Sequence, residues 1–173
     1  MAWKPASISE TSPWTRRCAG SIFSMMWREH MNLEWEQDWL EQFDNRLEEL
    51  MANYPAEFEY EDLNFGVRID NDRDKLRRWF MTFENADPDK SKHYFNATRY
   101  HGDETGGCLE WTWEIHHMSD FLGLPATGKT TLVQGMTIHA FKDGKIVLER
   151  SLWDTAALMR QLGLQAPVEV EFH

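Results

Sequence analysis

The 173-residue chain carries 29 acidic and 18 basic residues, for a formal net charge of −11. This excess argues against nucleic acid or an anionic membrane as a partner, because both bind basic surfaces, and it favours a neutral or cationic ligand. Apolar residues make up 42% of the chain and charged residues 27%, which is typical of one globular domain with a buried core.

Cysteine use and hydropathy indicate the compartment. Two cysteines, Cys18 and Cys108, are too few for a disulfide framework and suggest free thiols. No apolar run approaches the ~20 residues of a membrane span, and the N-terminus has no apolar segment of the secretory kind. We therefore expect a cytoplasmic protein that does not bind membranes.

In chain order, residues 1–31 predict an N-terminal arm, and residues 32–173 a single domain. A first helix is predicted before Pro55, because apolar residues recur at helical spacing: Trp39, Leu40, Phe43, Leu47, Leu50, Met51 and Tyr54. Residues 58–67 predict a strand or bent ribbon. A second helix is predicted to start at the N-cap Asn71 and to bury Leu76 and Phe80.

A series of strands follows. Alternation predicts four of them, over residues 93–101, 109–117, 129–141 and 146–154. Asp143-Gly144 predicts a tight hairpin turn. A last helix over residues 155–162 is closed by Gly163, and the tail after Pro167 could add an edge strand. Strands segregated from helices indicate an α+β fold, and a curved sheet packed on helices leaves a hollow for a ligand.

One motif suggests nucleotide binding, but its context does not. Gly123 to Thr130 fits the spacing of a phosphate-binding loop. That loop requires a following helix, whereas residues 130–138 are β-branched and strand-like. We therefore predict no cofactor.

The last third of the chain contains a set of ordered motifs, which read Phe121-x-Gly123-x-Pro125-x-Thr127-Gly128, Gly135-Met136-Thr137-Ile138, Phe141-x-Asp143-Gly144-Lys145-Ile146-Val147, Trp153-Asp154 and Leu158-x-x-Gln161-Leu162-Gly163. In these segments the chain resembles the SnoaL-like polyketide cyclases of the nuclear-transport-factor-2-like superfamily. The resemblance implies a cone-shaped, curved antiparallel sheet packed on helices, a hydrophobic small-molecule substrate, and a homodimer formed through the sheet.

Asp154 is the first candidate for catalysis. In the resembled cyclases the aspartate before the last helix is the catalytic base, and Asp154 holds that position. Alternation places Leu148, Arg150, Leu152 and Asp154 on one strand face. If that face lines the cone, burial raises the pKa of Asp154, and Arg150 can contact the substrate. The alternative is that Asp154 is the N-cap of the helix that follows it.

Two histidines are candidate proton donors or orienting groups. The resembled cyclases pair the aspartate with a histidine on the preceding strand, and His139 matches that position. His117 matches the histidine of a His-x-Gly-x-Phe pattern in relatives, with Ser119 in place of the glycine. The alternative for each is a core or surface histidine with a satisfied hydrogen bond.

Three further residues are predicted to bind substrate. Trp111 and Trp113 share a strand face and could form a wall for a flat ligand. Asp62 lies in the region where ketosteroid isomerases, a sister branch, keep their base. The other face of the tryptophan strand carries Glu110, Glu114 and His116, which favour a solvated surface over a metal site, and we predict no metal.

The sequence therefore predicts a cofactor-free acid–base enzyme, an aldol-type cyclase or isomerase acting on a carbonyl-containing hydrophobic molecule. The alternative is a non-catalytic ligand-binding or dimerisation module of the same fold. A poised Asp154 near a histidine in an apolar cavity favours the enzyme. An Asp154 bonded only to the helix, beside a cavity filled with tryptophans, favours the module.

Overall fold

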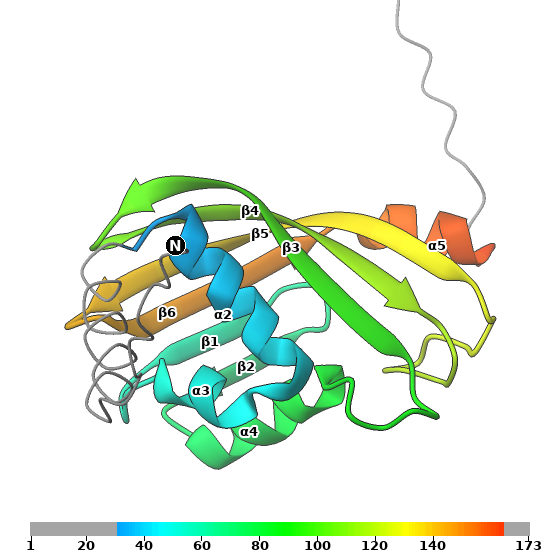
Figure 1. The fold of residues 1–173 in the computed structure, drawn as a ribbon, viewed down its shortest axis with the longest axis horizontal. Coiled ribbons are helices and arrows are strands. Elements are labelled where there is room, and N and C mark those ends of the chain that lie inside the picture. The colour runs from blue at the N-terminus through cyan, green and yellow to red at the C-terminus, as the bar shows by residue number, and fades with distance from the viewer. Residues whose placement is uncertain (1–30, 165–173) are drawn as a thin grey trace, which may run out of the picture.

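A computed structural model describes residues 31–164 of the chain. The predicted arm up to residue 30 and the predicted edge strand after Pro167 lie outside these residues. Six strands form one curved sheet, and helices α2, α3 and α4 lie over one of its faces (Figure 1). We call this covered face the inner face and the opposite one the outer face.

The first predicted helix is two helices, α2 (Leu33–Asn45) and α3 (Leu47–Ala52). The prediction of one helix was wrong because Arg46, with φ −122° and ψ 45°, leaves the helical conformation. α2 begins at Asn32, whose side chain accepts a hydrogen bond of 3.0 Å from the backbone N–H of Trp35. The break lets α3 turn toward α4 while α2 crosses the sheet (Figure 1).

The predicted ribbon is a hairpin of β1 (Glu59–Asp62) and β2 (Val67–Asp70). Helix α4 (Arg73–Phe80) and a 3-10 turn (Met81–Phe83) follow it. The cap of α4 is Asp72, not the predicted Asn71, because Asn71 adopts a φ of +58° and its side chain accepts the backbone N–H of Phe58 instead.

The four later strands and the last helix confirm the predicted elements: β3 (Lys92–Asp103), β4 (Gly106–His116), β5 (Thr130–Lys142), β6 (Lys145–Trp153) and α5 (Thr155–Leu162). Asp143 and Gly144 form the β5–β6 turn with positive φ angles, and Gly163, with φ +82°, ends α5.

The sheet order is β2-β1-β6-β5-β4-β3. Neighbouring strands are antiparallel except β1 and β6, which run parallel. The α+β fold with a curved sheet packed on helices is therefore as predicted. No helix within residues 31–164 is long and apolar enough to cross a membrane.

Polar residues interrupt the inner face where an ordinary core would be apolar. On β4 this face carries Leu109, Trp111, Trp113 and Ile115, all buried. On β5 and β6 it carries buried polar side chains: Thr131, Thr137, His139, Glu149 and Ser151. Buried polar groups need partners, so this part of the inner face is the first place to look for a functional site.

Candidate active site

A small cavity lies between α2 and the inner face of the sheet. Its volume is about 40 Å³, room for one to a few water molecules. Aromatic rings make most of its wall, and four polar side chains from three neighbouring strands complete it: Asp62 from β1, Glu149 and Ser151 from β6, and Thr137 from β5. An aromatic enclosure with a few polar groups has the lining of a small-molecule site, at a much smaller volume.

Glu149 is the central carboxyl group of this cavity. It is 2% exposed, and its Oε2 accepts a hydrogen bond from the hydroxyl of Tyr54 at the end of α3. Within the described residues its Oε1 has no hydrogen-bond partner. Burial raises the pKa of Glu149 to about 7, although the charge of His139 and the bond from Tyr54 act in the opposite direction. A carboxyl group in this state can exchange a proton near neutral pH.

Asp62 supplies a second carboxyl group. It lies beside Ser151 in the parallel register of β1 and β6. Its Oδ1 accepts the backbone N–H groups of Asn64 and Phe65, each at 2.9 Å. Burial raises the pKa of Asp62, and the two N–H groups partly offset that rise because they stabilise the ionised form.

Tyr60 is the neighbour of Glu149 across the β1–β6 pair. Its hydroxyl oxygen accepts a hydrogen bond from the indole N–H of Trp79. Burial raises the pKa of Tyr60 well above its usual value, so the hydroxyl keeps its proton. The cavity wall therefore holds a carboxyl group and a phenol donor side by side.

Behind this wall lies a buried ion pair. Nδ1 of His139 on β5 donates a 3.0 Å hydrogen bond to Oε1 of Glu36 on α2, and both side chains are fully buried. Burial alone would lower the pKa of His139, but the charge of Glu36 and its hydrogen bond outweigh that effect and raise it. The pair does not itself line the cavity.

Trp111 narrows the cavity from the β4 side. Its indole N–H donates to Thr137 at 2.8 Å, and Thr137 is bonded to Ser151 at 2.9 Å. The indole lies over Gly135 so closely that a Cβ at residue 135 would be 2.2 Å from Cη2 of Trp111. A glycine is needed there because the ring occupies the space of a side chain.

A comparison with models of protein families shows to which family the chain belongs. The model of the SnoaL-like polyketide cyclases matches residues 35–162. The chain belongs to the SnoaL-like polyketide cyclase family. A comparison with curated protein sequences gives no match.

Solved structures agree with the fold of the SnoaL-like family. A proposed polyketide cyclase from Xanthomonas campestris superposes with TM-score 0.62 at 18% identity, covering 75% of this chain and 94% of that one. A hypothetical protein of ketosteroid isomerase-like fold from Catenulispora acidiphila gives 0.58 at 16% identity, covering 73% and 90%. An LEH-like epoxide hydrolase from M. tuberculosis gives 0.57 at 14% identity, covering 75% and 87%.

Three of the residues predicted to bind substrate line the cavity together. Trp111 and Trp113 form part of its wall, and Asp62 faces it from β1. His139 is one step removed, because it is the cross-strand partner of Glu149 on the inner face. A role in binding or catalysis for these four residues stays a prediction.

Arg150 and Asp154 share one side of the strand, as alternation predicted, but that side does not line the cone. The inner face of β6 carries Glu149, Ser151 and Trp153. Side chains alternate along the chain, so Arg150, Leu152 and Asp154 point to the outer side of the sheet. Asp154 is exposed, and its Oδ1 accepts the backbone N–H of Ala157 at 2.7 Å as the N-cap of α5. Arg150 instead bonds Glu61 at 2.6 Å.

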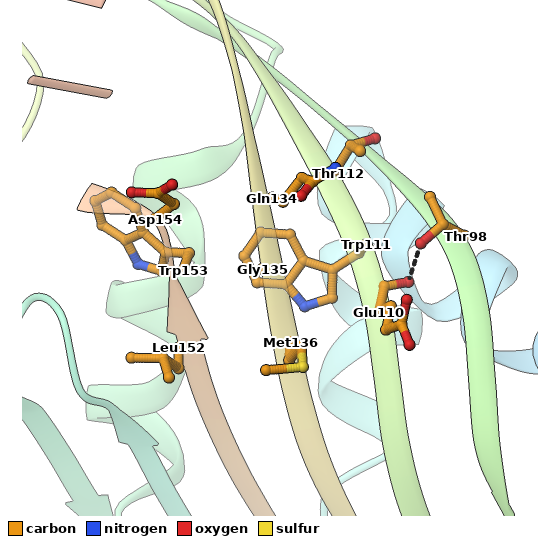
Figure 2. A pocket seen from close by; sticks show the side chains of 10 residues that line it. All are labelled: Thr98, Glu110, Trp111, Thr112, Gln134, Gly135, Met136, Leu152, Trp153 and Asp154. Atoms are coloured by element: carbon orange, nitrogen blue, oxygen red, sulfur yellow. Dashed lines mark hydrogen bonds between the residues drawn. The ribbon is translucent and has the colours of Figure 1, made fainter. Parts of the chain in front are cut away.

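Asp154 borders a different hollow, on the outer face of the sheet (Figure 2). Met136 and Leu152 give this hollow an apolar floor, and Glu110 and Thr98 line its far side, where the Thr98 hydroxyl donates to the Glu110 carbonyl at 3.0 Å. The catalytic role of Asp154, drawn from the family resemblance, stays a prediction, and it would place the chemistry outside the cone.

His117 is separated from the cavity. It follows β4, is fully buried, and its Nε2 is hydrogen-bonded to the hydroxyl of Thr131 at 2.9 Å. Burial lowers its pKa. This matches the core histidine of the alternative interpretation only in part, because Nδ1 is buried and has no hydrogen-bond partner within the described residues. A catalytic role for His117 stays a prediction.

The phosphate-loop-like motif has a structural use. A strand, β5, follows it, and Lys129 donates to the carbonyls of Gln161 and Leu162 at the end of α5, each at 3.2 Å. On the outer face, His116 pairs with Glu114 at 2.6 Å and His101 with Glu110 at 3.1 Å. These side chains are engaged with one another at the surface.

Sequence reasoning missed Glu149, Tyr60 and the Glu36–His139 pair. One signal for Glu36 was available: it occupies the apolar stripe of α2, one turn before Trp39 and Leu40. A charged residue at a core position of a helix predicts a buried partner. For Glu149 the hydrophobic pattern of β6 pointed the wrong way. Leu148 and Leu152 make the opposite face of the strand look like the buried one.

Proposed function

We propose that this SnoaL-like protein is a cofactor-free acid–base enzyme for a carbonyl-containing hydrophobic small molecule, with Glu149 as the proton acceptor. The observation that carries the proposal is a 2% exposed carboxyl group of pKa about 7 at an aromatic cavity, and one oxygen of that group has no hydrogen-bond partner among residues 31–164. General bases work best when their pKa lies near the working pH.

The neighbours of Glu149 supply the other parts of such a reaction. Glu149 would remove a proton next to the carbonyl carbon, and negative charge would develop on the carbonyl oxygen. Tyr60, which keeps its hydroxyl proton and lies across from Glu149, would donate a hydrogen bond to that oxygen. The enolate could then attack a second carbonyl, as in an aldol closure, or be reprotonated elsewhere, as in an isomerisation.

The first experiment measures α-proton exchange in D2O by ¹H NMR, with the bicyclic ketone 2-tetralone as probe. We expect the wild-type chain to accelerate exchange and Glu149→Gln to lose about 100-fold or more of that acceleration. The wild-type rate should rise with pH through about 7 as Glu149 ionises.

Asp154→Asn is the matched comparison, because asparagine is also a good N-cap. Exchange that survives in Asp154→Asn and disappears in Glu149→Gln supports the proposal. The reverse pattern would return the chemistry to Asp154. Equal exchange in all three proteins and in buffer would overturn the proposal for this class of ketone.

A non-catalytic module of the same fold is the second candidate, and the filling of the cavity by aromatic side chains favours it over an enzyme. At about 40 Å³ the cavity is much smaller than the ~300 Å³ of the smallest usual ligand sites. If 2-tetralone shifts the indole N–H resonances of Trp111 and Trp113 without any exchange, the module is the better description.

We also propose that the outer face forms a homodimer. Four apolar side chains are about half exposed there, on β5 and β6: Leu132, Met136, Ile138 and Leu152. We expect Leu152→Asp to halve the mass measured by light scattering after size exclusion. Leu63→Asp, at an exposed apolar residue in the β1–β2 turn, should leave the mass unchanged. A monomeric wild-type chain at micromolar concentration would contradict the proposal.

A further inference from the structure

Glu36 is a carboxylate in a position that the helix pattern reserves for an apolar side chain. It falls on the stripe of α2 that also carries Trp39, Leu40 and Phe43, and no part of it is exposed. Burying a carboxylate is unfavourable unless it is paired. An exposed pair elsewhere on the helix would serve stability at lower cost, so the placement calls for another reason.

The partner of Glu36 is held in one orientation. The imidazole of His139 packs edge-to-face against Trp39, with ring centroids 4.6 Å apart, and its Nδ1 donates to Glu36 at 3.0 Å. Trp35 and Phe141 enclose the ring further. Because Nδ1 donates its hydrogen to Glu36, the hydrogen bond fixes the orientation of the imidazole ring and keeps one proton on Nδ1.

His139 faces the proposed base directly across the sheet. His139 and Glu149 are paired residues of the β5–β6 ladder on the inner face, where cross-strand side chains are ~5 Å apart at Cβ. Other ionisable groups face this cluster from the packed elements: Tyr54 from the turn after α3, Tyr60 and Asp62 from β1, and Tyr100 from β3. Cys108, on the outer side of β4, lies within the field of Glu36. Among these groups His139 is the only one that can become positive.

We propose that Glu36 is a positioning residue: it keeps His139 oriented and protonated, and the His139 imidazolium keeps Glu149 available as an ionised base. The inference rests on the proposed role of Glu149. It assigns no substrate contact to Glu36 or to His139. The pair acts from behind the cavity wall, through the orientation and the charge of His139.

The sign of the effect separates this role from the alternatives. The charge of His139 lowers the pKa of Glu149 more strongly than the charge of Glu36 raises it. If Glu36 acts through His139, Glu36→Gln loses the imidazolium, and the pKa of Glu149 rises. If Glu36 acts only by direct repulsion, the same substitution lowers that pKa. A merely structural role leaves it unchanged.

The experiment is a carboxyl-carbon NMR titration of the full chain, with the Glu149 signal assigned through Glu149→Gln. We expect Glu36→Gln to raise the Glu149 midpoint by about 1 pH unit or more, as a lost neighbouring charge does. In a His139→Asn background the same substitution should lower the midpoint, because only direct repulsion is then removed. Glu61→Gln, which neutralises the outer-face partner of Arg150, should not move it.

A midpoint that falls or stays constant in Glu36→Gln overturns the proposal. If the variants do not fold, a second measurement on the wild-type chain still tests the proposal. The imidazole ¹⁵N shifts of His139 should report an imidazolium at pH 7, and a neutral ring at that pH also overturns the proposal. Both readouts are independent of turnover, so the pair can be confirmed or rejected whether or not Glu149 proves to be catalytic.

Discussion

The two faces of β6 place similar carboxyl groups in opposite circumstances. Glu149, on the inner face, is enclosed by aromatic rings and carries a pKa of about 7. Asp154, just past the end of the strand, is exposed and caps a helix. Because desolvation raises the pKa of Glu149, the inner face prepares this carboxyl group for proton transfer near neutral pH.

The ion pairs of the two faces differ in the same way. Glu36–His139 spans 3.0 Å and is fully buried, whereas Glu61–Arg150 spans 2.6 Å near the surface. The shorter pair is the one expected to contribute less to folding, because solvent screens it. Distance alone therefore does not rank these interactions, and the following substitutions test the ranking.

The largest effect is expected at Glu36. Glu36→Leu leaves His139 buried without a partner and should lower the free energy of unfolding by about 3 kcal/mol, measured by urea denaturation at pH 7. Arg150→Ala, the outer-face counterpart, should cost less than about 1 kcal/mol. Adding His139→Leu to Glu36→Leu should recover part of the loss, since no polar atom is then stranded. Equal losses at Glu36 and Arg150 would contradict the contrast between the faces.

The next effect depends on pH. The folded pKa of Glu149 is raised from 4.5 to about 7, so ionising it in the fold costs stability as pH rises through that window. Glu149→Gln should therefore gain about 2 kcal/mol of stability relative to wild type between pH 5 and pH 8. His139, whose pKa is also raised, stabilises the fold at low pH in both proteins. Thermal midpoints at the two pH values would test this, and a gain that shrinks with rising pH would refute it.

A smaller effect is expected where Trp111 covers Gly135. Gly135→Ala places a methyl group 2.2 Å from the indole, so the ring must move and unfolding should become easier by about 1–3 kcal/mol. The cost should be smaller in a Trp111→Leu background, measured as a double-mutant cycle. An additive result would mean that the ring is not the obstacle.

The smallest effect is expected at the outer-face carboxylate. Asp154→Ala should destabilise the chain by about 1 kcal/mol through loss of the N-cap, while Asp154→Asn should change little. Circular dichroism melts would compare the two variants. A larger loss in Asp154→Asn than in Asp154→Ala would argue that the charge, not the cap, is what Asp154 contributes.

Local patterns were sufficient to predict the elements of the later half of the chain. Alternation along β4, the Asp143-Gly144 turn and the Gly163 cap depend on backbone preferences that act within a few residues. The earlier half was harder. Arg46 leaves the helical conformation inside a continuous helical pattern, and Asn71 adopts a positive φ while its side chain accepts the backbone N–H of Phe58, 13 residues away.

The sequence by itself determined the fold class, the family and the aromatic wall of Trp111 and Trp113, because these follow from periodicity and from contiguous motifs. The tertiary structure alone decided which carboxyl groups are buried. Glu36, Asp62 and Glu149 meet only when α2, β1 and β6 assemble, and β6 buries its more polar face. The pKa of a carboxyl group depends on that enclosure and on neighbouring charges distant in sequence, and neither is visible in the local order of residues.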